Sequence, residues 1–423
     1  MLETHCRTLA LEAGIKRLPD EVLSMIFELG HLGATPCAFA LRVSHVCRRF
    51  RGIALSTPCL WTKVSPGYSL DQTHSFLSRS GQVGLDICIP WRASLGGEDK
   101  YDDILRILGS ESHRWTCLRI ASNDAEPRLR KLGITNFPCL LNLQCDSDAG
   151  TPSFNTPSLQ RINGTLCDPD VKFAYQSQLS ILDVIFYERR NIEVVEFSRA
   201  VHEMRNLREF SLTMEACDCV EMPPNTAKPE FERHSVLIDK ISFSIKNGCD
   251  YKIVGPVYSA VSFLFATTFT LSLEHLEGGD TIDFLYDCEQ NMVPYGSSVI
   301  INITNLSDPN LEWSWFYLLD TLTQTCRIAH TIHFNAPSAR FVSPSEPFDS
   351  ESGYHTLRNL RFECCDRLSP HDIMKLVNQF MLNEDLDDHE SIQSLGIFSC
   401  RGIREQFLIN LGERLSGKLE WTI

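Results

Sequence analysis

The sequence contains none of the short motifs that mark common catalytic centres. It has no G-x-S-x-G, H-E-x-x-H or G-x-G-x-x-G and no calcium-loop pattern. The run from Gly412 to Lys418 has the spacing of a phosphate loop, but Leu419 stands where magnesium needs Ser or Thr. Only five residues follow Lys418, so no helix fits there to face a phosphate. We therefore expect no enzyme and no cofactor.

Cysteine pairs with the C-x-x-C spacing are also missing; the closest neighbours are Cys217 with Cys219 and Cys364 with Cys365. The 17 cysteines are scattered and form no C-x-x-C pair, the spacing that zinc and redox sites commonly use. We expect no metal, and instead buried free thiols in a reducing compartment, the cytoplasm or the nucleus. The acidic residues between Asp385 and Glu390 are expected to form a solvated loop rather than a cation site.

Positive charge is scarce. The formal net charge is -15, which argues against binding to nucleic acid, whose phosphates attract basic surfaces. Residues 1–64 carry +3 and residues 65–423 carry -18. This difference suggests two surfaces with different partners, and the alternative for the acidic body is that its charge only keeps the protein soluble. No signal peptide is visible. The longest uncharged run, 253–273, contains Gly255 and Pro256 and is predicted to be a buried helix followed by a strand, not a membrane span.

Residues 15–64 have a dense helical pattern. Pro19 suits the first position of a helix, which Gly30 and Gly33 end. A second apolar set with helical spacing comprises Phe39, Val43, Val46, Cys47, Phe50, Ile53 and Ala54. So short a segment buries too little surface to be stable alone, yet it has more apolar side chains than its own core needs. Docking to a partner protein and packing against the rest of the chain are both open on this ground.

The residues of this segment resemble the F-box motif. LPDEVLSMIFEL and VSHVCRRFRGIALSTPCLW match its pattern of Leu-Pro, a carboxylate, two aliphatics, Ile-Phe, Val-Cys-Arg-x-aromatic and Pro-x-Leu-Trp. The resemblance implies docking on a Skp-type adaptor and, through it, on a cullin. The residues that it assigns to the adaptor contact are Leu18, Pro19, Glu21, Val22, Leu23, Ile26, Phe27, Val43, Val46, Cys47, Phe50, Leu60 and Trp61.

The next segment, up to residue 122, mixes helix and strand. Leu85, Ile87 and Ile89 alternate as in a strand, and a helix and a second strand, Leu118–Ile120, follow. Its R-S-G, L-D-I and H-R-W-x-x-L-R-I phrases resemble the linker region of many fungal F-box proteins.

Short apolar strands then recur at separations of 19 to 35 residues, around and above the range of leucine-rich repeats. They are centred near Leu143, Ile162, Leu182, Phe210, Phe243, Leu271, Ile301, Ile332, Leu360, Leu395 and Trp421. Phrases such as Leu357-x-x-Leu360-x-Phe362 share the L-x-x-L-x-L signature, and Ser369 is expected to cap a helix. A non-solenoid α/β domain is the alternative.

The predicted fold is α/β, a three-helix F-box followed by an irregular leucine-rich-repeat-like solenoid with a curved, mostly parallel sheet. We expect a flexible tail (1–14), the F-box (15–64), the linker region (65–122) and a substrate-recognition domain (123–423). The predicted function is the non-catalytic substrate receptor of a Skp–cullin–F-box ubiquitin ligase. The rivals are an F-box scaffold that delivers no ubiquitin and an undetected enzyme.

Overall fold

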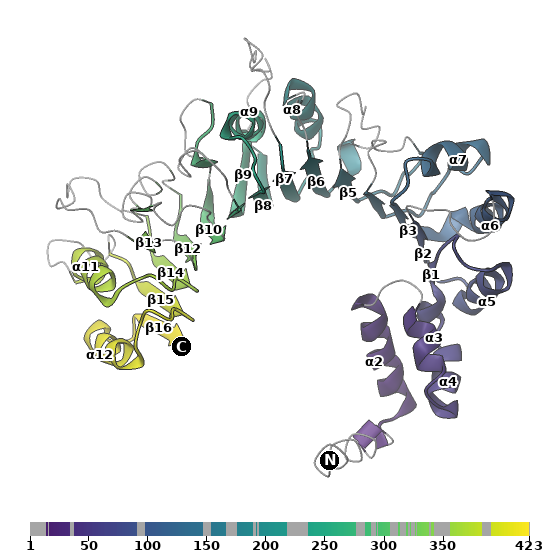
Figure 1. Ribbon diagram of the computed structural model, residues 1–423, viewed down its shortest axis with the longest axis horizontal. Helices are drawn as coiled ribbons and strands as arrows, with labels where there is room; N and C mark the ends of the chain where they lie inside the picture. The colour runs from purple at the N-terminus through teal and green to yellow at the C-terminus, as the bar shows by residue number, and fades with distance from the viewer. Residues whose placement is uncertain are drawn as a thin grey trace. The chain divides into compact units, whose positions relative to one another are not determined.

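The chain forms two compact units, Met1–Gly164 and Thr165–Ile423, in the computed structural model (Figure 1). The residues that the structure describes are 14–15, 17–33, 38–90, 98–146, 154–165, 176–188, 192, 194–217, 236–275, 284–288, 293, 295–304, 312–313, 319, 322, 326, 328–337, 340–341, 356–382 and 391–422. Almost all of the predicted tail and the acidic run 385–390 lie outside them. The predicted domain boundaries stay predictions.

The first unit begins with helices and continues with a parallel sheet whose strands follow chain order. Its elements are α2 (Asp20–Gly33), α3 (Ala38–Ser44), α4 (Arg48–Leu55), η1 (Pro58–Trp61), β1 (Lys63–Val64), α5 (Leu70–Ser80), β2 (Leu85–Ile89), α6 (Glu98–Ser110), η2 (Ser112–Arg114), β3 (Trp115–Ile120), α7 (Ala125–Lys131), β4 (Asn142–Cys145) and β5 (Arg161–Thr165). The predicted helical module is confirmed, and the strands predicted at Leu85–Ile89 and Leu118–Ile120 are present as β2 and within β3.

The second unit continues the alternation of strand and connecting segment. Its elements are η3 (Gln176–Gln178), β6 (Ile181–Tyr187), α8 (Val194–His202), β7 (Glu209–Glu215), β8 (Val236–Lys246), α9 (Tyr251–Val261), β9 (Leu264–Glu274), β10 (Gly296–Thr304), β11 (Glu312–Trp313), β12 (Thr331–Asn335), β13 (Arg340–Phe341), β14 (Asn359–Glu363), α11 (Pro370–Phe380), β15 (Ser394–Phe398), α12 (Glu405–Leu415) and β16 (Leu419–Thr422). β6 to β10, β12 and β14 to β16 pair in parallel, while β11 and β13 form a separate pair.

All the strands expected from β4 onward are present, and most of them alternate buried and more exposed side chains. In β7, Phe210, Leu212 and Met214 are buried against the helices, whereas Ser211 and Thr213 lie on the other face. Figure 1 shows α8, α9, α11 and α12 on one side of the strands of the second unit. The uncharged run 253–273 folds as predicted, as most of α9 followed by most of β9.

Left-handed residues follow many strands of the second unit. Positive φ angles between 45° and 53° occur at Glu188, Ala216, Asn247, His275, Cys364 and Ser399, each directly after a strand. The next residue is Cys at 217, 365 and 400, and the sulfur of each lies within hydrogen-bond distance of two carbonyls, the one that ends its own strand and one in the neighbouring strand. The same turn therefore recurs along the sheet.

These contacts explain part of the cysteine content. All described cysteines are free, and those at 145, 217, 249, 326, 365 and 400 are buried, as expected. Cys47, Cys139 and Cys288 are exposed instead. Burial raises the pKa of the half-buried Cys117 thiol to about 12, so it stays protonated at neutral pH.

Candidate functional site

Helix α2 begins one residue later than the sequence predicts. Asp20 is its first residue, and the carbonyl of Pro19 accepts the amide of Leu23. Asp20 and Glu21 place negative charge in the first turn, where it complements the helix dipole. The helix runs through Gly30 and ends at Gly33. Gly30 leaves room for the Phe39 ring, since a Cβ at this position would lie 2.4 Å from the ring.

The inner face of α2 forms the core of the helical module. Leu23 and Phe27 are buried, and the Phe27 ring meets Phe50 of α4 edge-on at 5.0 Å between centroids. His31 is also buried, and neither ring nitrogen has a hydrogen-bond partner among the described residues. Burial and the nearby positive charge of Lys63 lower the pKa of His31 to about 4, so the ring is neutral at pH 7.

The outer face of α2 is apolar as well. Its exposed side chains recur every three to four residues and therefore form one stripe along the helix. We call Val22, Met25, Ile26, Leu29 and Leu32 the outer face of α2. Leu29 is 68% exposed and Leu32 is 74% exposed. A surface helix normally turns polar side chains outward, so this stripe is a candidate surface for contact with another protein.

Helices α3 and α4 replace the single helical stretch that the apolar spacing suggests. His45 and Val46 form a turn, and the extended Cys47 begins α4 by accepting the amide of Phe50 on its sulfur, at 3.4 Å. Val43 is buried, whereas Val46 is 64% exposed. Because of this break, Val46, one of the residues of the predicted apolar set, is exposed to solvent.

Trp61 connects the helical module to the rest of the first unit. Its side chain is fully buried, and its indole N–H donates to the carbonyl of Ala54 at 2.8 Å. The ring packs edge-on against Phe76 of α5, and the Arg79 guanidinium lies 4.4 Å from the ring centroid. The module is therefore continuous with α5 and the strands that follow.

The structure separates the predicted adaptor-contact residues by exposure. The buried ones are Leu23, Phe27, Val43, Leu60 and Trp61; the half-buried ones are Leu18 and Phe50; the exposed ones are Pro19, Glu21, Val22, Ile26, Val46 and Cys47. Sequence reasoning missed Met25, Leu29 and Leu32 of the outer face. The same three-to-four-residue spacing, read around the other side of the helix, could have found them.

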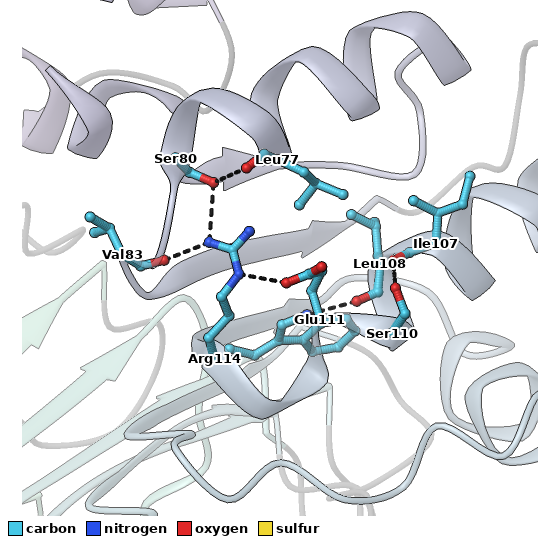
Figure 2. Close-up of polar contacts among 9 residues, drawn as sticks. Leu77, Ser80, Val83, Ile107, Leu108, Ser110, Glu111 and Arg114 are labelled. Carbon is cyan, nitrogen blue, oxygen red and sulfur yellow. Dashed lines mark hydrogen bonds and ion pairs between the residues drawn. The ribbon is translucent and has the colours of Figure 1, made fainter. Parts of the chain in front are cut away.

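The H-R-W phrase of the linker region holds neighbouring elements together. Figure 2 shows the buried Arg114 between three partners: its guanidinium donates to the Ser80 hydroxyl at 3.1 Å, to the Val83 carbonyl at 2.8 Å and to Glu111 at 2.8 Å. The indole of Trp115 donates to the carbonyl of Leu108 at 3.1 Å. These bonds join η2 to the end of α5 and β3 to α6, so the phrase is structural in this chain.

The described residues hold no group of three His, Cys, Asp or Glu side chains that could bind a metal ion. In the same part of the chain, no helix has the length and apolar character needed to cross a membrane.

The run from Gly412 to Lys418, which has the spacing of a phosphate loop, lies at the end of a helix and not before one. Gly412 lies inside α12, and β16 comes after Ser416 and Gly417, which both have positive φ angles. The order is helix, turn and strand, the reverse of a phosphate loop.

A family model described as F-box-like matches residues 15–66. A search of curated proteins found no match for the chain. Residues 15–66 thus form an F-box-like domain, as the sequence motif predicts, and domains of this kind bind Skp1-type adaptors. F-box domains are typically non-catalytic. The matched range contains all of α2, α3, α4 and η1.

Proposed function

We propose that this chain is the substrate-recognition subunit of a Skp–cullin–F-box ubiquitin ligase. The F-box-like domain docks on the adaptor, and the strand-rich remainder recruits a protein target for ubiquitination in the cytoplasm or the nucleus. The chain supplies binding surfaces and no catalytic group. The observation that carries the proposal is the exposed apolar outer face of α2 within the residues that match the family.

The energetics of the outer face favour a protein partner. Each Leu, Ile or Val that becomes fully buried contributes about 1.5–3 kcal/mol. Val22 and Ile26 are 38% and 46% exposed, so they gain less than Leu29 and Leu32 do. A helix-binding groove on the adaptor gains from the whole stripe together, which is the usual way in which an amphipathic helix is recognised.

The recruitment of a target by the second unit rests on its repeated architecture. Strands, left-handed turns and turn cysteines recur in register along the parallel sheet, which supports a leucine-rich-repeat-like solenoid. The face of the sheet opposite the helices carries short polar side chains such as Ser211, Ser242 and Thr270. We infer that a folded target meets this polar face.

Pull-down of the full chain with purified adaptor tests the proposal. We expect wild type to retain the adaptor, and Leu29→Glu to weaken binding by roughly 10- to 100-fold because a charge replaces buried apolar area. Ile409→Glu is the matched control, since Ile409 is an exposed apolar residue of α12. Failure of wild type to bind the adaptor would refute the proposal.

The second candidate is an F-box scaffold that never delivers ubiquitin. The polar face of the second unit does not distinguish the two, because both roles need a binding surface. Co-purification separates them: a ligase subunit brings down cullin together with the adaptor, whereas a scaffold brings down the adaptor alone.

A further inference from the structure

The F-box-like domain contains a long segment without acidic residues. No Asp or Glu occurs between Glu28 and Asp71, although the chain has 54 of them. The same segment carries Arg42 on α3 and three arginines at the start of α4. A basic surface is therefore concentrated on two helices of an otherwise acidic protein.

Three of these four arginines are exposed to solvent. Arg42, Arg48 and Arg51 are exposed, and none forms an ion pair with another residue that the structure describes. We call these three residues the basic cluster. Arg49 differs, because its guanidinium binds the Asp20 carboxylate at 2.6 Å and also donates to the carbonyl of Leu18.

The basic cluster is placed against the helix dipole. Arg48 and Arg51 lie in the first turn of α4, which has no acidic residue. The amino end of a helix carries partial positive charge, so arginine there destabilises the free domain. An acidic group brought by a partner would relieve this repulsion.

The cluster also borders the surface that the proposed function uses. The Arg49–Asp20 ion pair holds the first turn of α4 beside the first turn of α2, where the outer face begins with Val22. The exposed Val46 directly precedes Cys47 and the cluster. Apolar contact and positive charge are thus available at one end of the domain.

We propose that the adaptor presents carboxylates to Arg42, Arg48 and Arg51, and that these charges speed and orient its docking on α2. This inference rests on the proposed function and names the chemistry of the adaptor surface. Nucleic acid and anionic membrane fit less well, because the chain carries a net charge of -15 and its adjoining exposed face is apolar.

Association kinetics of the full chain with purified adaptor test the inference. Salt would be raised from about 50 mM to about 500 mM, which shortens the range of charge interactions several-fold. We expect the association rate of wild type to fall steeply with salt. Arg48→Glu with Arg51→Glu should slow association by about 10- to 100-fold at low salt and flatten the salt dependence, with a smaller change in dissociation rate.

Stability and charge controls separate this effect from misfolding. Glutamate suits the first turn of a helix, so the same double variant should melt at the wild-type temperature or above it. Arg48→Lys with Arg51→Lys should keep fast association. Lys131→Glu with Arg367→Glu changes the net charge by the same amount at exposed sites on α7 and before α11, and should associate like wild type.

The outcomes distinguish the inference from the function on which it rests. Adaptor binding that depends neither on salt nor on the cluster overturns the inference and leaves adaptor docking in place. No adaptor binding by wild type overturns both. Cluster-dependent binding to short duplex DNA or to phosphatidylserine vesicles, with unchanged adaptor kinetics, also overturns it.

Discussion

Helices α2 and α11 both bury an apolar inner face, but their outer faces differ in polarity: that of α2 is apolar and that of α11 is polar. Leu23 and Phe27 of α2 are buried, as are Ile373, Leu376 and Val377 of α11. Within α11, all of which the structure describes, no large apolar side chain is exposed, whereas α2 exposes its whole outer face. The fold of this chain accounts fully for α11 but for only one side of α2, and the other side indicates a partner.

The largest expected effect separates the two helices by stability. Leu376→Ala should lower the free energy of unfolding by about 2–5 kcal/mol, because it leaves a cavity under α11. Leu29→Ala should change it by less than about 0.5 kcal/mol, since the side chain faces solvent. Denaturant unfolding measures both; equal losses would mean that the outer face of α2 is already covered in the free protein.

A smaller effect follows from the buried His31 on the inner face of α2. Its pKa of about 4 lies below the ordinary value of 6.5, so the unfolded chain takes up a proton first. The contribution of the neutral ring is complete above about pH 6.5 and is lost as pH falls toward 4, on the order of 3 kcal/mol. His31→Gln cannot titrate and should flatten the pH dependence of unfolding; an unchanged slope would place the acid sensitivity elsewhere.

Substitutions at the N-terminal caps of α11 and α4 should have the smallest effects on the free energy of unfolding. Ser369 and Asp372 form a reciprocal capping box at α11, and Ser369→Ala should cost about 1 kcal/mol. Cys47→Ala at α4 should cost only about a few tenths of that, because a thiol 3.4 Å from an amide is a weak acceptor. Paired unfolding curves would contradict this ranking if Cys47→Ala proved the more damaging.

Much of the fold follows from sequence periodicity. Strands such as β7 and β12 were predictable because buried residues alternate along them, and the capped helix α11 because Ser369 precedes a clear apolar stripe. The two-residue strands β1, β11 and β13 are too short to produce a periodic signal. Helices α7 and α8 also went unpredicted.

The candidate site was predictable in part. The F-box motif located the module, but it mixes residues that hold the core, such as Leu60 and Trp61, with exposed residues such as Val22. The position of a residue in the motif does not show whether its side chain is exposed, because the family pattern contains core residues and exposed residues alike. The break at Cys47 was also hidden, since apolar spacing continues across it and the cap is a weakly polar thiol.

Site-specific photo-crosslinking tests the central claim most directly. A crosslinking side chain would replace Leu29 on the outer face of α2 or, as the control, Ile409 on α12, in the full chain mixed with adaptor. The account predicts that position 29 crosslinks to the adaptor and that position 409 does not. Crosslinking at position 409 alone, or at neither position despite a stable complex, would contradict docking through the outer face of α2.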